Sequence, residues 1–290
     1  MIIGDRVIMN GELVEPAAVR FDLDNLDIAY GYGCYETLKV RDGLLYFPEF
    51  HEERLLSSAA ILGIQHKVRP GQVVDSLSAL VAATGAHDNN LRVVMIGHDD
   101  RPADWYAFVQ PPILPAAELY RDGVDCLLFR GERHFPQAKS LSMLLSTIAY
   151  RAAQSLGCYD AILVNGRGEL TEGTRTNLLY VRRDEAGVAF TPPRRDVLEG
   201  ITRRTIIQAL GDAGLRTVER VLTLAEATDG SCEIAVTSTS SRILPVRRLA
   251  GLSGAGVAEP SVAIGATNHQ VTGEDPVPAA SRAPLVTVDA

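Results

Sequence analysis

Cysteine is scarce in this sequence: the 290 residues include four cysteines, and no two of them form a CxxC pair. Structural zinc sites and disulfide frameworks need paired or clustered cysteines, so we expect no metal site and a cytoplasmic protein with reduced thiols. Long apolar stretches are also missing. No run approaches the roughly 20 residues that cross a bilayer, and the opening MIIGDR does not have the pattern of a secretory signal. We therefore expect no membrane partner.

An excess of basic charge is the next absence. There are 28 Lys and Arg against 36 Asp and Glu, which gives a net charge of −8. Binding to nucleic acid needs a basic surface, so we do not expect nucleic acid as a partner. A local basic pocket for a small anion stays possible. The hydrophobic share of 46% and the charged share of 22% are those of an ordinary globular protein, and the length suggests two domains.

The first half of the chain shows the alternation and the Asn-Gly and Asp-Gly turn signals of antiparallel strands. Two helices follow, and each begins at a proline and ends before a glycine. The predicted strands cover 2–8, 13–14, 34–40, 44–47, 91–97 and 104–109, and the predicted helices cover 48–62 and 70–84. On the strand 34–40, Tyr35, Thr37 and Lys39 share one face because successive side chains alternate.

The second half mixes strands and helices. The predicted strands cover 124–130, 160–165, 177–182, 188–191, 216–221 and 233–237, and the predicted helices cover 142–156 and 201–213. A proline-rich segment before them predicts a linker. We therefore expect an α/β protein with a smaller domain at 1–110, a linker at 111–118 and a larger domain at 119–250. Residues 251–290 contain no aromatic residue, and we expect them to be poorly ordered.

Five short features have side chains suited to binding or catalysis, although each alone is typical of an ordinary surface. Lys139 lies among small and apolar residues, where a partly desolvated amine can act as a nucleophile. The pair Glu172-Gly173 suits a tight bend beside a ligand. The predicted helix start at 200–202 and the hydroxyl-rich run at 237–241 offer hydrogen-bond donors to an anion. Arg54 adds a positive charge within the first helix.

Six segments, taken together and in this order, resemble the class IV (fold-type IV) aminotransferases, which depend on pyridoxal 5'-phosphate (PLP). That family includes branched-chain and D-amino acid aminotransferases and aminodeoxychorismate lyase. The resemblance covers roughly residues 1–248. The six segments are 30–37 (YGYGCYET), 51–55 (HEERL), 139–141 (KSL), 172–177 (EGTRTN), 200–203 (GITR) and 239–246 (TSSRILPV).

The resemblance assigns roles to the candidate cofactor residues. Lys139 would form the Schiff base with PLP and then transfer the proton between the substrate carbon and the cofactor. Glu172 would pair with the pyridine nitrogen and keep it protonated. The phosphate would be bound by Arg54, by the helix start at Gly200, Ile201 and Thr202, and by Thr239 and Ser240.

The resemblance also implies a substrate pocket. Tyr35 and Thr37 would face it, and Arg101 occupies the place of a carboxylate-binding arginine in D-amino acid aminotransferases. The histidine expected two residues later is Ala103, and the tyrosine that branched-chain enzymes place five residues after the lysine is Leu144. Neither substrate signature is complete, so the substrate stays open.

Two further positions bear on the reaction. Glu36 stands where lyases of the family usually lack an acid, which favours transamination. Arg175 stands where the family prefers a small residue. The sequence therefore predicts a ping-pong aminotransferase that moves an amino group between a small amino acid, or a related primary amine, and a 2-oxo acid. The alternatives are a lyase that releases pyruvate and a binding protein that has kept the fold without catalysis. Members of the family are usually homodimers, so we expect a homodimer.

Overall fold

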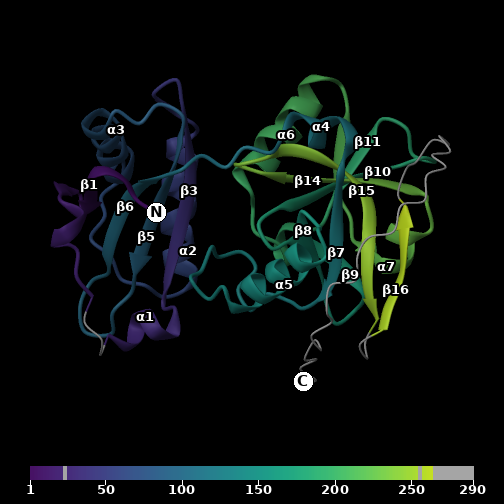
Figure 1. Ribbon diagram of the computed structural model, residues 1–290, viewed down its shortest axis with the longest axis horizontal. Helices are drawn as coiled ribbons and strands as arrows, with labels where there is room; N and C mark the ends of the chain where they lie inside the picture. Colours follow the sequence, from purple (N-terminus) through teal and green to yellow (C-terminus); the bar gives the residue numbers. More distant parts are fainter. Residues whose placement is uncertain (22–24, 254–256, 264–290) are drawn as a thin grey trace.

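The computed structural model describes residues 1–21, 25–253 and 257–263. They build two sheets with their helices, and Figure 1 shows the two parts side by side, connected after β6 by the irregular stretch 111–116. The predicted α/β class is confirmed. Among these residues no helix is long and apolar enough to cross a membrane.

The smaller part contains an antiparallel six-stranded sheet in the order β2-β1-β6-β5-β3-β4. Its strands are β1 Ile3–Met9, β2 Glu12–Val14, β3 Gly33–Arg41, β4 Leu44–Leu45, β5 Asn89–Ile96 and β6 Asp104–Gln110. Its helices are the one-turn η1 Pro16–Ala18, α1 Leu26–Tyr30, α2 Pro48–Ile61 and α3 Gln72–Thr84. The helices α2 and α3 begin and end close to the predicted proline and glycine positions.

Alternation along β3 decides which side of this sheet becomes the core. Leu38 and Val40 are buried with Leu55 of α2 and Leu77 of α3. The opposite face of β3 carries Tyr35, Thr37 and Lys39, as the alternation predicts. Figure 1 shows β3 as the strand that lies towards the second part, and Lys39 on this polar face reaches that part, where its Nζ donates to the Ser240 carbonyl at 2.7 Å.

The second part contains a ten-stranded sheet in the order β12-β11-β10-β14-β15-β7-β8-β9-β13, with β16 paired to β15. The strands are β7 Val124–Arg130, β8 Asp160–Val164, β9 Glu169–Gly173, β10 Asn177–Arg182, β11 Val188–Thr191, β12 Arg216–Glu219, β13 Leu222–Thr223, β14 Cys232–Ser238, β15 Arg242–Ser253 and β16 Val257–Ala263. The helices are α4 Ala117–Asp122, α5 Leu144–Ser155, the short η2 Arg194–Asp196, α6 Ile201–Asp212 and α7 Leu224–Thr228.

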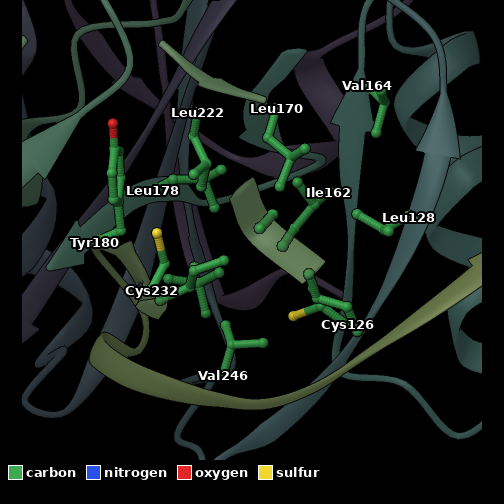
Figure 2. Close-up of a cluster of buried hydrophobic side chains, with 14 of the residues drawn as sticks. Cys126, Leu128, Ile162, Val164, Leu170, Leu178, Tyr180, Leu222, Cys232 and Val246 are labelled. Atoms are coloured by element: carbon green, nitrogen blue, oxygen red, sulfur yellow. The ribbon is translucent and has the colours of Figure 1, made fainter. Parts of the chain in front are cut away.

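An additional pairing between β9 and β10 closes this sheet on itself, with Glu172 directly opposite Asn177. The enclosed space is filled by apolar side chains from many strands, among them Ile162, Leu178 and Val246 (Figure 2). Burying such side chains is worth about 25 cal/mol per Å² of apolar surface. The closed sheet is therefore a rigid frame, and Glu172 is built into its seam.

The helix α5 covers the outside of this frame. Along β7, Cys126 and Leu128 point into the enclosed core, whereas Leu127 packs outward against Ala149 and Ala153 of α5. Small alanines let the helix approach the strand closely. All four cysteines of the chain are buried and unpaired.

Several elements differ from the sequence-based prediction. The short helices α1, α4 and α7 and the strands β9 and β13 were not expected, because their polar or very short segments carry no clear periodicity. The long strand β15, Arg242–Ser253, was also not expected. Within the segment 251–290, for which we expect poor order, residues 251–253 form the end of β15 and residues 257–263 form the strand β16. Residues 254–256 and 264–290 lie outside the described residues.

Candidate active site

Lys139 lies in the loop between β7 and α5, and backbone contacts attach this loop to β3 of the other part. The Lys139 carbonyl accepts a hydrogen bond from Tyr35 N at 2.9 Å, and Leu141 N donates to the Gly33 carbonyl at 2.8 Å. Lys139 N also donates to Ser58 Oγ at 3.0 Å. Because both sides of the lysine are bound to β3 and α2, the position of its side chain is set by the frame rather than by a flexible loop.

The side chain of Lys139 meets the aromatic ring of Tyr35. Its Nζ atom lies 4.5 Å from the centre of the ring, and the guanidinium carbon of Arg92 lies 3.9 Å from the same centre. Burial raises the pKa of the Tyr35 hydroxyl, but the charges of Lys139, Arg92 and Arg133 oppose burial and leave this pKa below its ordinary value. The surroundings of the lysine amine are therefore strongly positive.

Glu172 is held at the end of β9 by three donors. Arg133 Nη1 lies 2.8 Å from one carboxylate oxygen, and Leu198 N donates to the other at 3.1 Å. Asn177 Nδ2 lies 3.4 Å from that second oxygen. Burial raises the pKa of Glu172, and Arg133 only partly opposes the increase. A further positive group at this carboxylate would stabilise its ionised form.

The turn that follows Glu172 is fixed by a second buried acid, Asp160. Its carboxylate accepts hydrogen bonds from Thr174 Oγ1, from Thr176 Oγ1 at 2.9 Å and from Ala161 N at 2.8 Å. A Cβ atom at Gly173 would come 2.1 Å from Thr176 Oγ1 and 2.6 Å from Asp160 Oδ2. The small residue at 173 is therefore required for the turn to close on the carboxylate.

Lys139 and Glu172 line one cavity. Its other walls come from Tyr35, Arg133, Ser140, Ser142, Met143, Ser146, Gly173, Thr174, Arg175, Thr176, Asn177 and Leu198. Residues from β3, from the loop before α5 and from the β9–β10 seam thus converge at one place. An amine, a carboxylate and the two guanidinium groups of Arg133 and Arg175 are suited to a small anionic cofactor and an anionic substrate.

A second hollow adjoins the first and is lined by Arg54 and Ile201. Two N–H groups of Arg54 donate to the Glu36 carboxylate at 2.7 Å each, and a third donates to the Glu199 carbonyl at 3.0 Å. His51 Nδ1 lies 2.7 Å from Glu36 Oε2. Burial alone would raise the pKa of Glu36, but Arg54 and His51 hold it well below its usual range. The ion pair fixes the arginine, which keeps spare N–H donors for an anion.

The start of α6 offers more donors. Its N-cap is Gly200, which provides no side-chain cap, so the first N–H groups of the helix stay available to an anion. A Cβ atom at Gly200 would come 1.9 Å from Asn177 Oδ1. Thr237, opposite Asn177 on the neighbouring strand, has a buried hydroxyl that lacks a hydrogen-bond partner in the described part of the chain. Unpaired donors of this kind fit a phosphate group, so the site suits PLP.

Four further residues predicted for the cofactor or the substrate do not line this cavity: Thr37, Arg101, Thr239 and Ser240. Thr239 and Ser240 are half-buried in the turn after β14, and the Ser240 carbonyl accepts a hydrogen bond from Lys39 Nζ at 2.7 Å. Thr37 is half-buried on the same face of β3 as Tyr35. Arg101 lies about half exposed beside Asp104, with 2.7 Å between the charged atoms. Neither Thr37 nor Arg101 is among the residues that line the two hollows.

Sequence reasoning missed three residues that shape the site: Arg92, Arg133 and Asp160. Arg92 lies directly opposite Thr37 in the pairing of β3 with β5, so a correct strand register would have placed it on the pocket face. Arg133 precedes Lys139 by six residues in an irregular loop and carries no pattern. Asp160 begins a buried strand, and an acid in that position was the available signal.

The chain matches the family described as amino-transferase class IV over residues 33–249. It is 28% identical over 256 residues to D-alanine aminotransferase of Bacillus licheniformis, with 85% of this chain and 89% of that protein covered. It is 27% identical over 258 residues to a putative branched-chain-amino-acid aminotransferase of Methanocaldococcus jannaschii, with 85% and 88% covered. A crystal structure of the branched-chain aminotransferase of Thermoproteus uzoniensis with norvaline superposes with a TM-score of 0.75 at 27% identity, covering 84% of this chain and 86% of that one.

Proposed function

Because the chain belongs to the class IV aminotransferases, we propose that it moves an amino group between a small amino acid, or a related primary amine, and a 2-oxo acid in a ping-pong cycle. The observation that carries this proposal is the shared cavity of Lys139 and Glu172. Each residue is fixed by a different sheet, so the amine and the carboxylate are set at two sides of the same space. We further propose two domains, 1–110 and 119–250, with the cofactor between them.

PLP, when bound, supplies the electron sink that lets the bond to the substrate's hydrogen break. Lys139 provides the amine that holds the cofactor and then takes and returns that proton. Glu172 pairs with the ring nitrogen, which gives the buried carboxylate the positive partner that Arg133 only partly supplies. The residues proposed for the phosphate are Arg54, the helix start at Gly200, Ile201 and Thr202, and the side chains of Thr239 and Ser240.

The relatives named D-alanine and branched-chain aminotransferases support small α-amino acids as substrates. We propose that Tyr35 and Thr37 contact the substrate, and that Arg101 contributes to carboxylate binding in a homodimer. Exposed apolar side chains near the site, among them Leu144 and Ile148 of α5, offer a surface for the second subunit. The buried, unpaired cysteines are compatible with the proposed cytoplasmic location.

The chain makes a direct test simple because it has three lysines, Lys39, Lys67 and Lys139. Borohydride reduction of the purified protein, followed by peptide mass spectrometry, should find PLP attached to Lys139 alone. Lys139→Ala should abolish the attachment and slow amino transfer by at least about 100-fold, the usual contribution of a positioned acid–base group. Lys67→Ala, which removes an exposed lysine, is the matched control and should keep both.

The reaction itself is checked with half-reactions. Mixing the holoenzyme with single L- or D-amino acids or amines should change the cofactor spectrum without any acceptor present, and addition of a 2-oxo acid should reverse the change. Release of pyruvate from an aminodeoxychorismate-type substrate, with no half-reaction from any amino acid, would instead identify a lyase. Full activity of Lys139→Ala with covalently bound PLP would refute the role of this lysine.

A further inference from the structure

Arg175 lines the cavity of Lys139 and Glu172, yet no part of the proposed cofactor binding requires it. It lies in the turn between the strands β9 and β10, and its side chain is exposed. Arginine in such a turn is ordinarily solvated and loosely placed. The contacts of this one are different, because the guanidinium group is directed and supported.

Two elements hold the Arg175 side chain. Its guanidinium carbon lies 3.9 Å from the centre of the Tyr150 ring on α5, and Nη2 donates to the Tyr159 carbonyl at 3.3 Å. The ring of Tyr159 lies 5.9 Å away and adds a second aromatic neighbour. Stacking of a guanidinium on aromatic rings keeps its charge and its outer N–H groups available while it restricts the side chain. The arginine is thus prepared for a ligand before any ligand arrives.

Two arginines line this cavity, Arg133 and Arg175, and among the described residues Arg175 is the one whose charge no acid pairs. Arg54 is paired with Glu36 and Arg133 with Glu172, each through a carboxylate at 2.8 Å or closer. Arg175 makes no ion pair with any carboxylate in residues 1–21, 25–253 and 257–263. Asp160 is near enough for Arg175 to lower its pKa against the effect of burial, but the Asp160 oxygens are taken by Thr174, Thr176 and Ala161 N.

We propose that Arg175 binds a carboxylate on the side chain of the substrate, so that the enzyme favours dicarboxylic amino acids and dicarboxylic 2-oxo acids. This inference rests on the proposed function and names the substrate class of the same site. The reacting carbon must lie at Lys139 Nζ, and the cations gathered around the Tyr35 ring there, Lys139 and Arg92, suit the carboxylate next to that carbon. Arg175 lines the same cavity beside Tyr150 of α5 and Tyr159, and the proposal places the far end of a longer substrate there.

The steady-state test compares two five-carbon acceptors, the dicarboxylate 2-oxoglutarate and the monocarboxylate 2-oxopentanoate. Arg175→Gln should raise KM for 2-oxoglutarate by about 10- to 100-fold, the usual effect of losing one charge-assisted contact, with KM for 2-oxopentanoate changed by less than about threefold. Arg175→Lys should recover part of the loss because the charge returns without the planar fork. Arg183→Gln, which removes an exposed arginine at the other end of β10, should behave as the wild type.

A binding measurement tests the same contact without turnover. Calorimetric titration of the holoenzyme with glutarate, which has neither an amino nor an oxo group, should give binding that Arg175→Gln weakens and that pentanoate does not reproduce. Unchanged KM and unchanged glutarate binding in Arg175→Gln would overturn the inference. Equal losses for both acceptors would also overturn it, because Arg175 would then bind the carboxylate next to the reacting carbon.

Failure of the inference and failure of the proposed function are distinguishable. If the wild type shows no half-reaction with any amino acid or amine, the proposed aminotransferase activity fails. The glutarate titration still reports on Arg175 in that case. An unchanged cofactor spectrum and melting temperature in Arg175→Gln establish that the substitution has left the rest of the site intact.

Discussion

Replacing Arg133 by glutamine tests how the buried carboxylate of Glu172 is kept ionised. Arg133 is the one side chain with a full positive charge that contacts Glu172 among the described residues, at 2.8 Å. Its other N–H groups donate to the carbonyls of Ala138 and Phe135 in the loop that carries Lys139. The substitution Arg133→Gln therefore removes the positive partner of Glu172 and, at the same time, the hydrogen bonds that hold the loop of Lys139.

The magnitude follows from the burial of the pair. Removing one partner of a buried ion pair typically costs about 3–5 kcal/mol, because the remaining charge is left without compensation. At roughly 2–4 °C per kcal/mol for a protein approaching this size, the melting temperature of Arg133→Gln at neutral pH should fall by about 6–20 °C. Bound PLP supplies another positive partner, so the loss in the holoenzyme should lie near the lower end of that range.

The dependence on pH separates the two effects of the substitution. The pKa of Glu172 in the folded protein is already above its ordinary value because of burial, and loss of Arg133 must raise it further. Below the ordinary glutamate pKa of about 4.3, Glu172 is protonated in both folded and unfolded chains, and its part of the loss vanishes. The part of the stability loss that comes from Glu172 grows as the pH rises above the pKa of Glu172 in the folded wild type. It levels off once the pH exceeds the pKa of Glu172 in the folded variant. Loss of the loop contacts stays constant with pH.

The assay is the melting temperature of the wild type, Arg133→Gln, Glu172→Gln and the double variant, followed by circular dichroism from pH 4 upward at about half-unit steps. The double variant should be more stable than Arg133→Gln at neutral pH, because it no longer buries an unpaired charge. Two results would refute the ion-pair reasoning and leave only the loop contacts as the cause. One is a decrease in melting temperature that does not change with pH. The other is a double variant whose decrease equals the sum of the decreases in the two single variants.

Two further substitutions probe the frame. Gly200→Ala places a Cβ atom 1.9 Å from Asn177 Oδ1, and this clash should raise the Kd for PLP by about 10-fold or more in an equilibrium titration. The control is Gly211→Ala in the same helix, where a Cβ meets nothing within 4 Å, and it should leave the Kd unchanged. Glu52→Gln should lower the free energy of unfolding by about 1–2 kcal/mol, because the Glu52 carboxylate accepts hydrogen bonds from three N–H groups at the start of α3. The cofactor spectrum should not change. A melting temperature equal to that of the wild type would contradict the capping role.

The elements that the sequence predicts best have both a periodic apolar pattern and a residue, such as proline or glycine, that marks where the element begins or ends. The helix α2 begins at Pro48, where a missing N–H costs nothing, and ends just before Gly63. The strand β11 has the predicted bounds, 188–191. The strand β9, with the sequence ELTEG, was instead read as part of a bend. Its polar side chains are satisfied by contacts from β8, from β10, from the loop before α6 and from Arg133. Such tertiary contacts leave no local periodicity.

The candidate site divides in the same way. Lys139, Glu172 and Arg54 are prominent in short motifs, and the structure brings the first two to one cavity and the third to the adjoining hollow. The residues that tune them are not in those motifs. Arg92 depends on the register of β3 with β5, and Arg133 depends on how the loop before α5 folds back. Neither register nor loop path is encoded in the spacing of a single segment.

The charges of the site explain how a protein with a net charge of −8 can bind an anionic cofactor and an anionic substrate. Glu36 forms an ion pair with Arg54, and Glu172 forms one with Arg133. These acids hold the two arginines in position and also cancel most of the long-range electric field of the arginines. At the place proposed for the phosphate, the remaining attraction is short-range and comes from the directed N–H groups of Arg54 and of the start of α6. A carboxylate that arrives later needs a cation whose charge has not been cancelled. Arg175, supported by tyrosine rings instead of by an acid, meets that requirement, and this is the physical reason for expecting selectivity for a second carboxylate in this cavity.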